Sequence, residues 1–427
     1  MSNDPSTITQ AKWADLLRGT NALLTIALTG GVALHAINIY IVTTILPSVV
    51  NDIGGLEYYA WNTTIFVATS IVGSALSSKI LNNLGPKFAY LIALLLFSLG
   101  SIWCAASPSM LSLLVGRAFQ GLGGGIFAQG GHWRWAFWSL LPVAILLALI
   151  VINQLPRKNN HAQQANKLPL LAIILLVASV LTISIGSLSS DLLSNTIGLL
   201  VGIGILVTIA LIDGKNGKRL LPTGSYSLKS ALGIIYLTMS LLVGGMTTEI
   251  YVPYFLQTIH HFSPLSAGYL TAIMAAGWTI GALFSANKTG SIVLKILRAG
   301  PVIIFMSLVV LAILTPNLQL VHSIALFIIY LIAMMGVGLG IGICWPHLVL
   351  RVFNAAPKGE ENLASSSVIT VQLYATALSA ALVGVVVNNT GLINPGGVEG
   401  AQQASVWLFS LFAICPFLGI FLIRKVK

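Results

Sequence analysis

The chain has 427 residues, of which 56% are hydrophobic and only 7% are charged. Soluble globular proteins carry about 25% charged residues, so this composition excludes a soluble enzyme or binding domain and indicates a polytopic membrane protein. Lys and Arg outnumber Asp and Glu by 21 to 10. In a membrane protein this excess is typical of cytoplasmic loops, so we expect no nucleic-acid partner.

Thirteen segments are apolar and near the length of about 20 residues that a membrane-spanning helix requires. Several contain glycine pairs four residues apart, which predict faces where two helices pack closely; these pairs are Gly198 and Gly202, Gly277 and Gly281, and Gly336 and Gly340. The expected fold is therefore all-α. The segments lie at 22–49, 61–80, 88–106, 109–129, 133–153, 168–187, 193–212, 231–257, 265–286, 299–315, 320–346, 364–387 and 404–423.

The charges of the connecting loops assign a side of the membrane to each loop. Lys12 and Arg18 predict a cytoplasmic N-terminus, and the basic residues at 424–427 predict a cytoplasmic C-terminus. The first connection carries Asp52 and Glu57 without a basic residue, so it is predicted to lie outside. This pattern predicts a multi-pass protein of the cell (inner) membrane.

One interval breaks the alternation of sides. Three candidate spans lie between the basic loop at 79–87 and the next basic loop, which begins at Arg157. Two loops on the same side need an even number of crossings between them, so either one segment does not cross or a crossing is missing. The weakest point is Gln129–His132, where two apolar stretches meet across a pair of glycines.

The two longest polar interruptions, 154–167 and 213–230, surround the apolar pair 168–187 and 193–212. One interpretation is that this pair consists of lipid-facing helices inserted between two functional halves. The alternative is that the two polar interruptions are simple linkers. The expected division is an N-terminal bundle at 1–153, incomplete near 126–132, a central inserted pair with its loops at 154–230, and a C-terminal bundle at 231–427.

Several motifs occur in the order and spacing of a known family. The run Gly116–Gly123 contains RxxQGxG, and Asn38–Pro47 is followed by DIGG at Asp52–Gly55. Further along, YVPYFLQ at Tyr251–Gln257 precedes SPLSAG at Ser263–Gly268. Over nearly its whole length the chain resembles the major facilitator superfamily, and within it the drug:proton antiporters with fourteen spans. The resemblance implies two helical bundles that rock about a site near the membrane midplane.

The departures from that family are equally informative. The acidic residue of the family's first helix falls on Asn38, which cannot carry a proton. The loop motif between helices two and three appears at 78–87 without its aspartate, and the glycine-proline motif of the fifth helix is missing. After Gly125–Gln129 the chain passes to HWRW, which resembles the start of helix six. We interpret this as an internal deletion, whether natural, a gene-model error or decay.

Ionisable groups inside spans are functional candidates because burying them is costly. Glu249 is the only acid deep within a span, so it is a candidate proton carrier, or a structural ion-pair partner. Arg117 is a candidate modulator of proton coupling, or a packing residue that donates to carbonyl groups. His35, one helical turn before Asn38, is a proton-coupling candidate because imidazole titrates near neutral pH; a packed, hydrogen-bonded histidine is the alternative.

Polar and aromatic side chains within the spans are candidates for lining a substrate cavity. Each is alternatively an ordinary contact at a helix interface or at the membrane surface. The cavity candidates are Asn38, Asn62, Gln120, Tyr251, Gln257, Gln372 and Tyr374, with Trp61, Tyr254 and Trp278 as further aromatic walls.

The sequence contains no phosphate-binding GxxxxGK[ST] loop, HExxH or GxSxG, so we expect no enzyme, no metal site and no cofactor. The leading hypothesis is a monomeric secondary transporter in the lipid bilayer that exports drug-like or amphipathic small molecules by antiport with protons. The alternative is a transport-incompetent truncated remnant or a partner-binding membrane protein.

Overall fold

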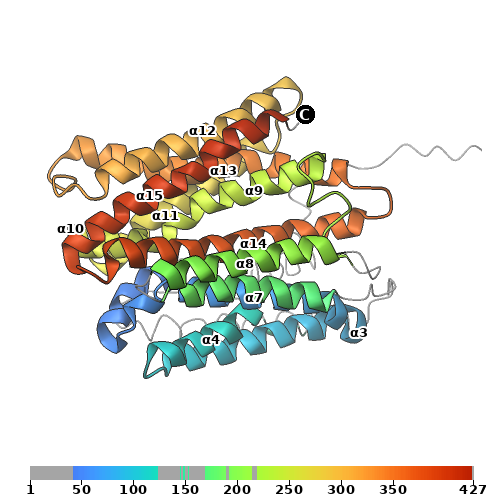
Figure 1. Ribbon diagram of the computed structural model, residues 1–427, viewed down its shortest axis with the longest axis horizontal. Coiled ribbons are helices and arrows are strands. Elements are labelled where there is room, and N and C mark those ends of the chain that lie inside the picture. Colours follow the sequence, from blue (N-terminus) through green and yellow to red (C-terminus); the bar gives the residue numbers. More distant parts are fainter. Residues whose placement is uncertain are drawn as a thin grey trace, which may run out of the picture.

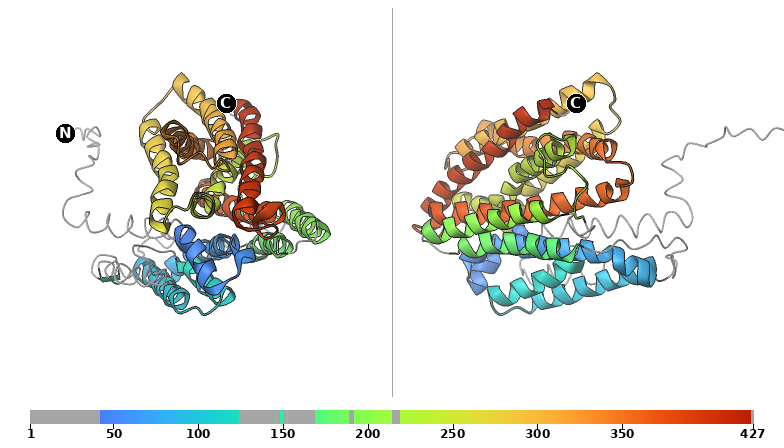
Figure 2. Two further views of the ribbon diagram at one scale, coloured as in Figure 1. Left: turned by 90° about the vertical axis from the view of Figure 1, so that its left-hand side faces the viewer. Right: turned by 45° about the vertical axis from the view of Figure 1, so that its right-hand side comes forward.

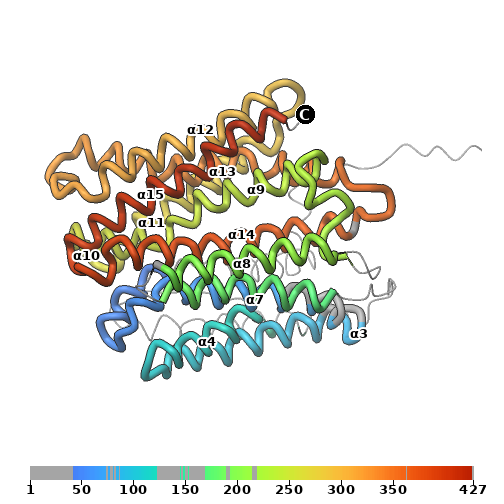
Figure 3. The backbone as a smooth tube through the Cα atoms, in the orientation of Figure 1, coloured from blue at the N-terminus to red at the C-terminus, as the bar shows by residue number. Residues whose placement is uncertain are grey.

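The computed structural model describes residues 42–123, 169–188, 192–213 and 219–425, with positions 145, 148–149 and 152; the remaining residues are drawn grey in Figure 3. Every regular element within these ranges is a helix, which confirms the predicted all-α fold. Among the described residues, eight helices are long and apolar enough to span a membrane, and shorter apolar helices lie at Val42–Ile53, Met110–Leu122 and Leu170–Gly186. His35, Asn38, Gln129–His132 and most of the predicted span 133–153 lie outside the described residues.

The helices follow the predicted spans closely, with different ends. They are η1 (Leu56–Tyr58), α3 (Trp61–Ala105), α4 (Met110–Gly123), α7 (Leu170–Gly186), α8 (Leu192–Ile212), α9 (Ala231–Thr247), η2 (Thr248–Tyr251), α10 (Val252–His260), α11 (Pro264–Ser285), α12 (Ser291–Leu314), α13 (Ile324–Ala355), α14 (Glu361–Val387), η3 (Asn388–Leu392), α15 (Gly397–Leu422) and η4 (Ile423–Lys425).

Local sequence explains where several helices begin. Ser230, Ser263 and Ser323 each precede a helix, and each side chain accepts a backbone N–H from the first turn. Such caps satisfy donors that have no partner within the helix. In contrast, α3 contains two predicted spans, which are separated only at Gly85, where φ is 81° and ψ is 167°. Glycine adopts positive φ readily, so the chain turns there without a loop.

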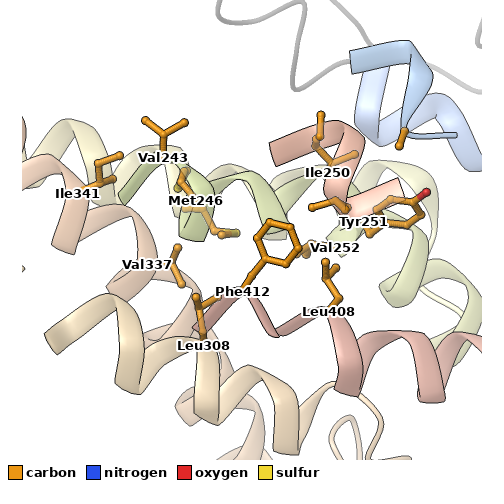
Figure 4. Packing of buried hydrophobic residues seen from close by; sticks show 14 of the residues in the cluster. Val243, Met246, Ile250, Tyr251, Val252, Leu308, Val337, Ile341, Leu408 and Phe412 are labelled. Carbon is orange, nitrogen blue, oxygen red and sulfur yellow. The ribbon is translucent and has the colours of Figure 1, made fainter. Parts of the chain in front are cut away.

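Helices α9 to α15, which we call the C-terminal group, pack around an apolar core (Figure 1) that continues into residues of the segment 42–113. Figure 4 shows Phe412 of α15 close to Met246 of α9, with Leu308 of α12 and Val337 of α13 nearby. Within this group α11 lies directly against α13. A Cβ atom built on Gly277 would lie 2.3 Å from the carbonyl oxygen of Met335, so the backbones nearly touch. The packing faces predicted from the glycine pairs are confirmed.

Residues Val42–Gly123 form a second group, the N-terminal group, and the pair α7 and α8 lies beside both groups (Figures 1 and 2). Helix α7 contacts α3 and also α14. Trp61 Nε1 of α3 donates to the carbonyl of Ser184 at 3.1 Å, and the hydroxyls of Ser179 and Tyr374 of α14 lie 2.9 Å apart. Because α7 bonds to helices of both groups, it covers the junction between them on this side.

Helix α8 packs on α7 through glycine, since a Cβ on Gly198 would lie 3.0 Å from the Cα of Gly186. Its other face exposes apolar side chains such as Leu193, Leu200 and Leu211. An exposed apolar face on a membrane helix meets lipid. The division of the chain at 153 and 230 stays a prediction.

Candidate functional site

Arg117 lies inside the N-terminal group, where only 1% of its surface is exposed. Its Nε donates to the backbone carbonyl of Asn62 at 3.3 Å, and its NH1 donates to Oε1 of Gln120 at 2.6 Å. The guanidinium also lies 4.3 Å from the ring centroid of Phe66, a favourable cation–π contact. The structure therefore brings together three sequence-predicted site residues, Arg117, Asn62 and Gln120.

The close contact between α4 and α3 holds this arrangement in place. Gln120 Nε2 donates to the hydroxyl of Ser101 at 3.0 Å, and Ser70 Oγ donates to the carbonyl of Gly121 at 2.9 Å. A Cβ on Gly121 would lie 2.2 Å from the carbonyl oxygen of Phe66, so only glycine permits this approach. These contacts match the packing interpretation of Arg117, and its coupling role stays a prediction.

Glu249 lies where the span Ala231–His260 departs from α-helical geometry. Pro253 has no N–H, so it cannot donate to the carbonyl of Glu249 four residues earlier. Val252 donates to that carbonyl instead, which gives the 3₁₀ turn η2. The Glu249 side chain is half-buried, between the buried Thr248 and Ile250. Sequence reasoning missed this turn, although the proline four residues after the acid signals it.

A cluster of aromatic rings joins the two groups at the end where the acidic first connection lies (left in Figure 1). Tyr59 is fully buried and stacks on Tyr251, with ring centroids 4.6 Å apart. Tyr254 packs edge-to-face with Tyr59, with ring centroids 5.5 Å apart. Near this cluster Gln257 Nε2 donates to the carbonyl of Thr44 at 3.1 Å. Loop charges predict this end to lie outside, so the two groups are in contact at the predicted outer end.

Sequence reasoning did not select Tyr59, because its partners are almost 200 residues away and no local pattern signals the contact. The remaining candidates lie elsewhere. Gln372 is half-buried on α14, two residues before Tyr374, whose hydroxyl contacts Ser179 of α7. Trp278 pairs with Trp345 at 5.5 Å within the C-terminal group. In the parts of the chain that the structure describes, no group of three His, Cys, Asp or Glu residues could hold a metal ion.

The sequence profile of the Major Facilitator Superfamily matches residues 28–132 and 124–380. The chain belongs to this superfamily. It is therefore a multi-pass membrane transport protein of the major facilitator fold and not an enzyme. A probable multidrug-efflux transporter of Mycobacterium tuberculosis is 31% identical, with 94% of each chain covered. Multidrug resistance protein 3 of Bacillus subtilis is 21% identical over an alignment that covers 84% of this chain and 78% of that protein.

Solved structures agree with this fold. The inward open conformation of the xylose transporter XylE from E. coli has a TM-score of 0.58 at 14% sequence identity, covering 96% of this chain and 97% of that one. An auto-inhibited peptide transporter of the POT family has a TM-score of 0.61 at 13% identity, with 94% and 96% covered.

The alignment with the mycobacterial relative has 454 positions, more than the 427 residues of this chain. Some positions of that relative therefore have no counterpart here. The profile also matches in two segments that overlap at 124–132. The internal deletion near Gln129–His132 stays a prediction.

Proposed function

We propose that this major facilitator protein exports drug-like or amphipathic small molecules from the cell in exchange for protons. The observation that carries the proposal is its similarity to a probable multidrug-efflux transporter over 94% of both chains. The two helical groups in contact at one end fit the rocking-bundle architecture of such carriers. Substrate and protons then reach a site between the groups alternately from the two sides.

Glu249 is the proposed proton-carrying group. Its position at a 3₁₀ turn between α9 and α10 resembles the discontinuous helices that form substrate and ion sites in secondary transporters. The neighbouring Tyr251 contacts Tyr59 of the N-terminal group, so η2 lies beside the contact between the two groups. A charge moved across a 100 mV membrane potential supplies about 2.3 kcal/mol, which is sufficient to drive export against a concentration gradient.

Arg117 is proposed as an electrostatic modulator of this proton transfer, acting from the N-terminal group. Asn62, Gln120, Tyr251, Gln257, Gln372 and Tyr374, with His35 and Asn38, remain candidates for the coupling and substrate-binding surfaces. The proposed carrier acts as a monomer in the cell (inner) membrane with both termini in the cytoplasm. No cofactor is part of the proposal.

Efflux by Glu249→Gln in proteoliposomes under an imposed pH gradient tests this role. We expect the variant to lose proton-driven transport while it still binds substrate, since the amide keeps the shape but cannot be deprotonated. Glu399→Gln is the matched control, because Glu399 is an exposed acid in the first turn of α15. Proton-driven efflux by Glu249→Gln at the rate of the control removes Glu249 from the mechanism.

A transport-incompetent remnant is the second candidate, favoured by the alignment positions without a counterpart in this chain. Lys87 Nζ donates to the carbonyl of Ile152 at 2.7 Å. This contact brings the two ends of the interval that holds three predicted spans close together, which supports the proposal that an even number of crossings separates them.

Cysteine labelling tests this topology. Lys87→Cys and Lys158→Cys, in a background with the three native cysteines replaced by serine, are labelled in vesicles of known orientation. We expect both positions to react from the cytoplasmic side. Reaction from opposite sides means that all three segments cross. The remnant interpretation is supported if the labelled protein is folded and yet moves neither solute nor protons.

A further inference from the structure

A cavity of 510 Å³ lies in the C-terminal group at the opposite end from the aromatic cluster. It lies between the start of α9, the turn that joins α11 to α12, and the last turns of α13. None of the sequence-predicted site residues lines it. Its charged and titratable lining residues are Lys288, His347 and Arg351, and no acidic side chain lines it.

The backbone adds to this positive character. Ala231, the first residue of α9, lines the cavity, and so does Gly290, which immediately precedes α12. No side chain caps the N-terminus of α12. Helix N-termini carry a partial positive charge and free N–H donors, and they bind phosphate groups. The Ser230 side chain caps α9, so the free donors at this cavity come from the N-terminus of α12, which meets two basic side chains there.

His347 is an independent sign that the cavity takes a ligand. The side chain is 4% exposed and lines the cavity. Its ring forms a hydrogen bond with the backbone of Ser285, whereas its buried Nε2 has no partner among the described residues. A buried polar atom without a partner is costly, and a bound ligand with oxygen atoms, reached directly or through water, would satisfy it.

The cavity is also open toward the apolar surface of the molecule. Leu350 lines it and is 55% exposed, and Ile292 in the first turn of α12 is exposed as well. A ligand whose charged group sits in the cavity can therefore extend apolar chains along α12 and α13. Soluble phosphate has no apolar part to contact this surface, whereas a phospholipid has acyl chains.

We propose that this cavity binds the phosphate group of an anionic phospholipid from the same leaflet. Lys288 and Arg351 contact the phosphate oxygens, the N-terminus of α12 donates backbone N–H groups, and His347 Nε2 contacts the headgroup. Loop charges predict that this end of the molecule is cytoplasmic, where anionic lipids attract basic groups close to the membrane surface. The acyl chains lie against Leu350 and its exposed neighbours.

Native mass spectrometry tests the proposal. The full chain is reconstituted in nanodiscs with equal amounts of phosphatidylglycerol and phosphatidylcholine, released, and examined for retained lipid. We expect the protein to retain phosphatidylglycerol over phosphatidylcholine by about tenfold or more, given two basic residues at the site. The double variant Lys288→Gln, Arg351→Gln is expected to lose that preference.

The matched control is Lys295→Gln with Arg298→Gln. These residues lie on α12 near the same end, are exposed, and do not line the cavity, so the control removes the same two charges. It is expected to keep the preference, as is the charge-conserving variant Lys288→Arg, Arg351→Lys. An equal preference in the cavity variant and in the wild type overturns the proposal, as does an equal loss in the cavity variant and the control.

Inorganic phosphate separates a lipid from a soluble ligand. In detergent without lipid, we expect millimolar phosphate to leave the melting temperature unchanged and phosphatidylglycerol to raise it, in the wild type and not in the cavity variant. Stabilisation by phosphate without stabilisation by the lipid overturns the lipid assignment. If the double variant does not fold, the single variant Lys288→Gln serves instead, because Lys288 is exposed in a turn.

Discussion

Replacing Gly338 by alanine tests the view that glycine sets the distance between α11 and α13. A Cβ atom on Gly338 would lie 1.7 Å from the carbonyl oxygen of Met274, where real contacts of this kind stay beyond 3.0 Å. The obstacle is backbone on both sides, so no side chain can move away to make room. The two helices must therefore separate by more than an ångström.

The size of the effect follows from that separation. A gap of 0.5–1 Å forfeits about a quarter to a half of the dispersion attraction between facing atoms. The contact between α11 and α13 extends along both helices, since Gly277, Gly281 and Gly342 approach the opposite backbone in the same way. Overpacking a filled interior typically costs about 1–3 kcal/mol, and we expect Gly338→Ala to lie at or above the upper value.

Thermal unfolding of the detergent-purified protein measures this cost. Gly204→Ala on α8 is the matched control, because a Cβ at Gly204 meets nothing within 4 Å. Alanine favours a helix over glycine by about 0.8–1 kcal/mol, so the control is expected to be as stable as the wild type or slightly more stable. A Gly338→Ala variant with the same melting temperature as this control refutes the argument from backbone contact.

Three further predictions follow from single contacts. Gln120→Leu removes the acceptor of a hydrogen bond from a buried cation, worth about 1.5–3 kcal/mol, so it lowers the melting temperature, while Gln120→Glu keeps an acceptor and loses less. Tyr59→Ala removes the ring that stacks on Tyr251, so a cysteine placed at Thr44 is labelled faster from the outside; an unchanged labelling rate contradicts the sealing role. Burial is the largest single influence on Glu360 and raises its pKa, but the two hydrogen bonds from Thr223 and the Arg219 charge together outweigh it and hold the pKa below its ordinary value. The stabilisation is therefore present above the ordinary pKa and is lost as the pH falls through the lowered pKa, so proteolysis between α8 and α9 should accelerate in that range. The acceleration should be smaller in Thr223→Val, which loses the hydroxyl donor to Glu360 but keeps the backbone N–H donor.

Within the described residues, hydropathy was sufficient to predict where the helices lie, because the cost of placing charges in lipid is visible residue by residue. It placed helix ends less well. The predicted span 320–346 stops before His347 and Arg351, whereas α13 continues to Ala355. A polar residue ends the apolar stretch but leaves the backbone hydrogen bonds of the helix intact, so the helix extends beyond the span.

In the candidate site, contacts within one helix could be predicted from the sequence, whereas contacts between helices could not. Spacing alone places Gln120 one turn after Arg117, and the structure pairs them. The second partner, the carbonyl of Asn62, comes from another helix and depends on how closely the glycines allow α4 and α3 to approach. The contact between Tyr59 and Tyr251 depends on the arrangement of the two groups, which no short pattern encodes.

The position of α7 affects how a hydrophobic solute can enter the molecule. On this side the surface between α3 and α14 is covered by α7, which is hydrogen-bonded to both. A compound dissolved in the bilayer therefore cannot enter between α3 and α14 on this side, because α7 blocks the way. Rocking of the two groups as proposed would require α7 to slide against one of these two neighbours, because it is hydrogen-bonded to both.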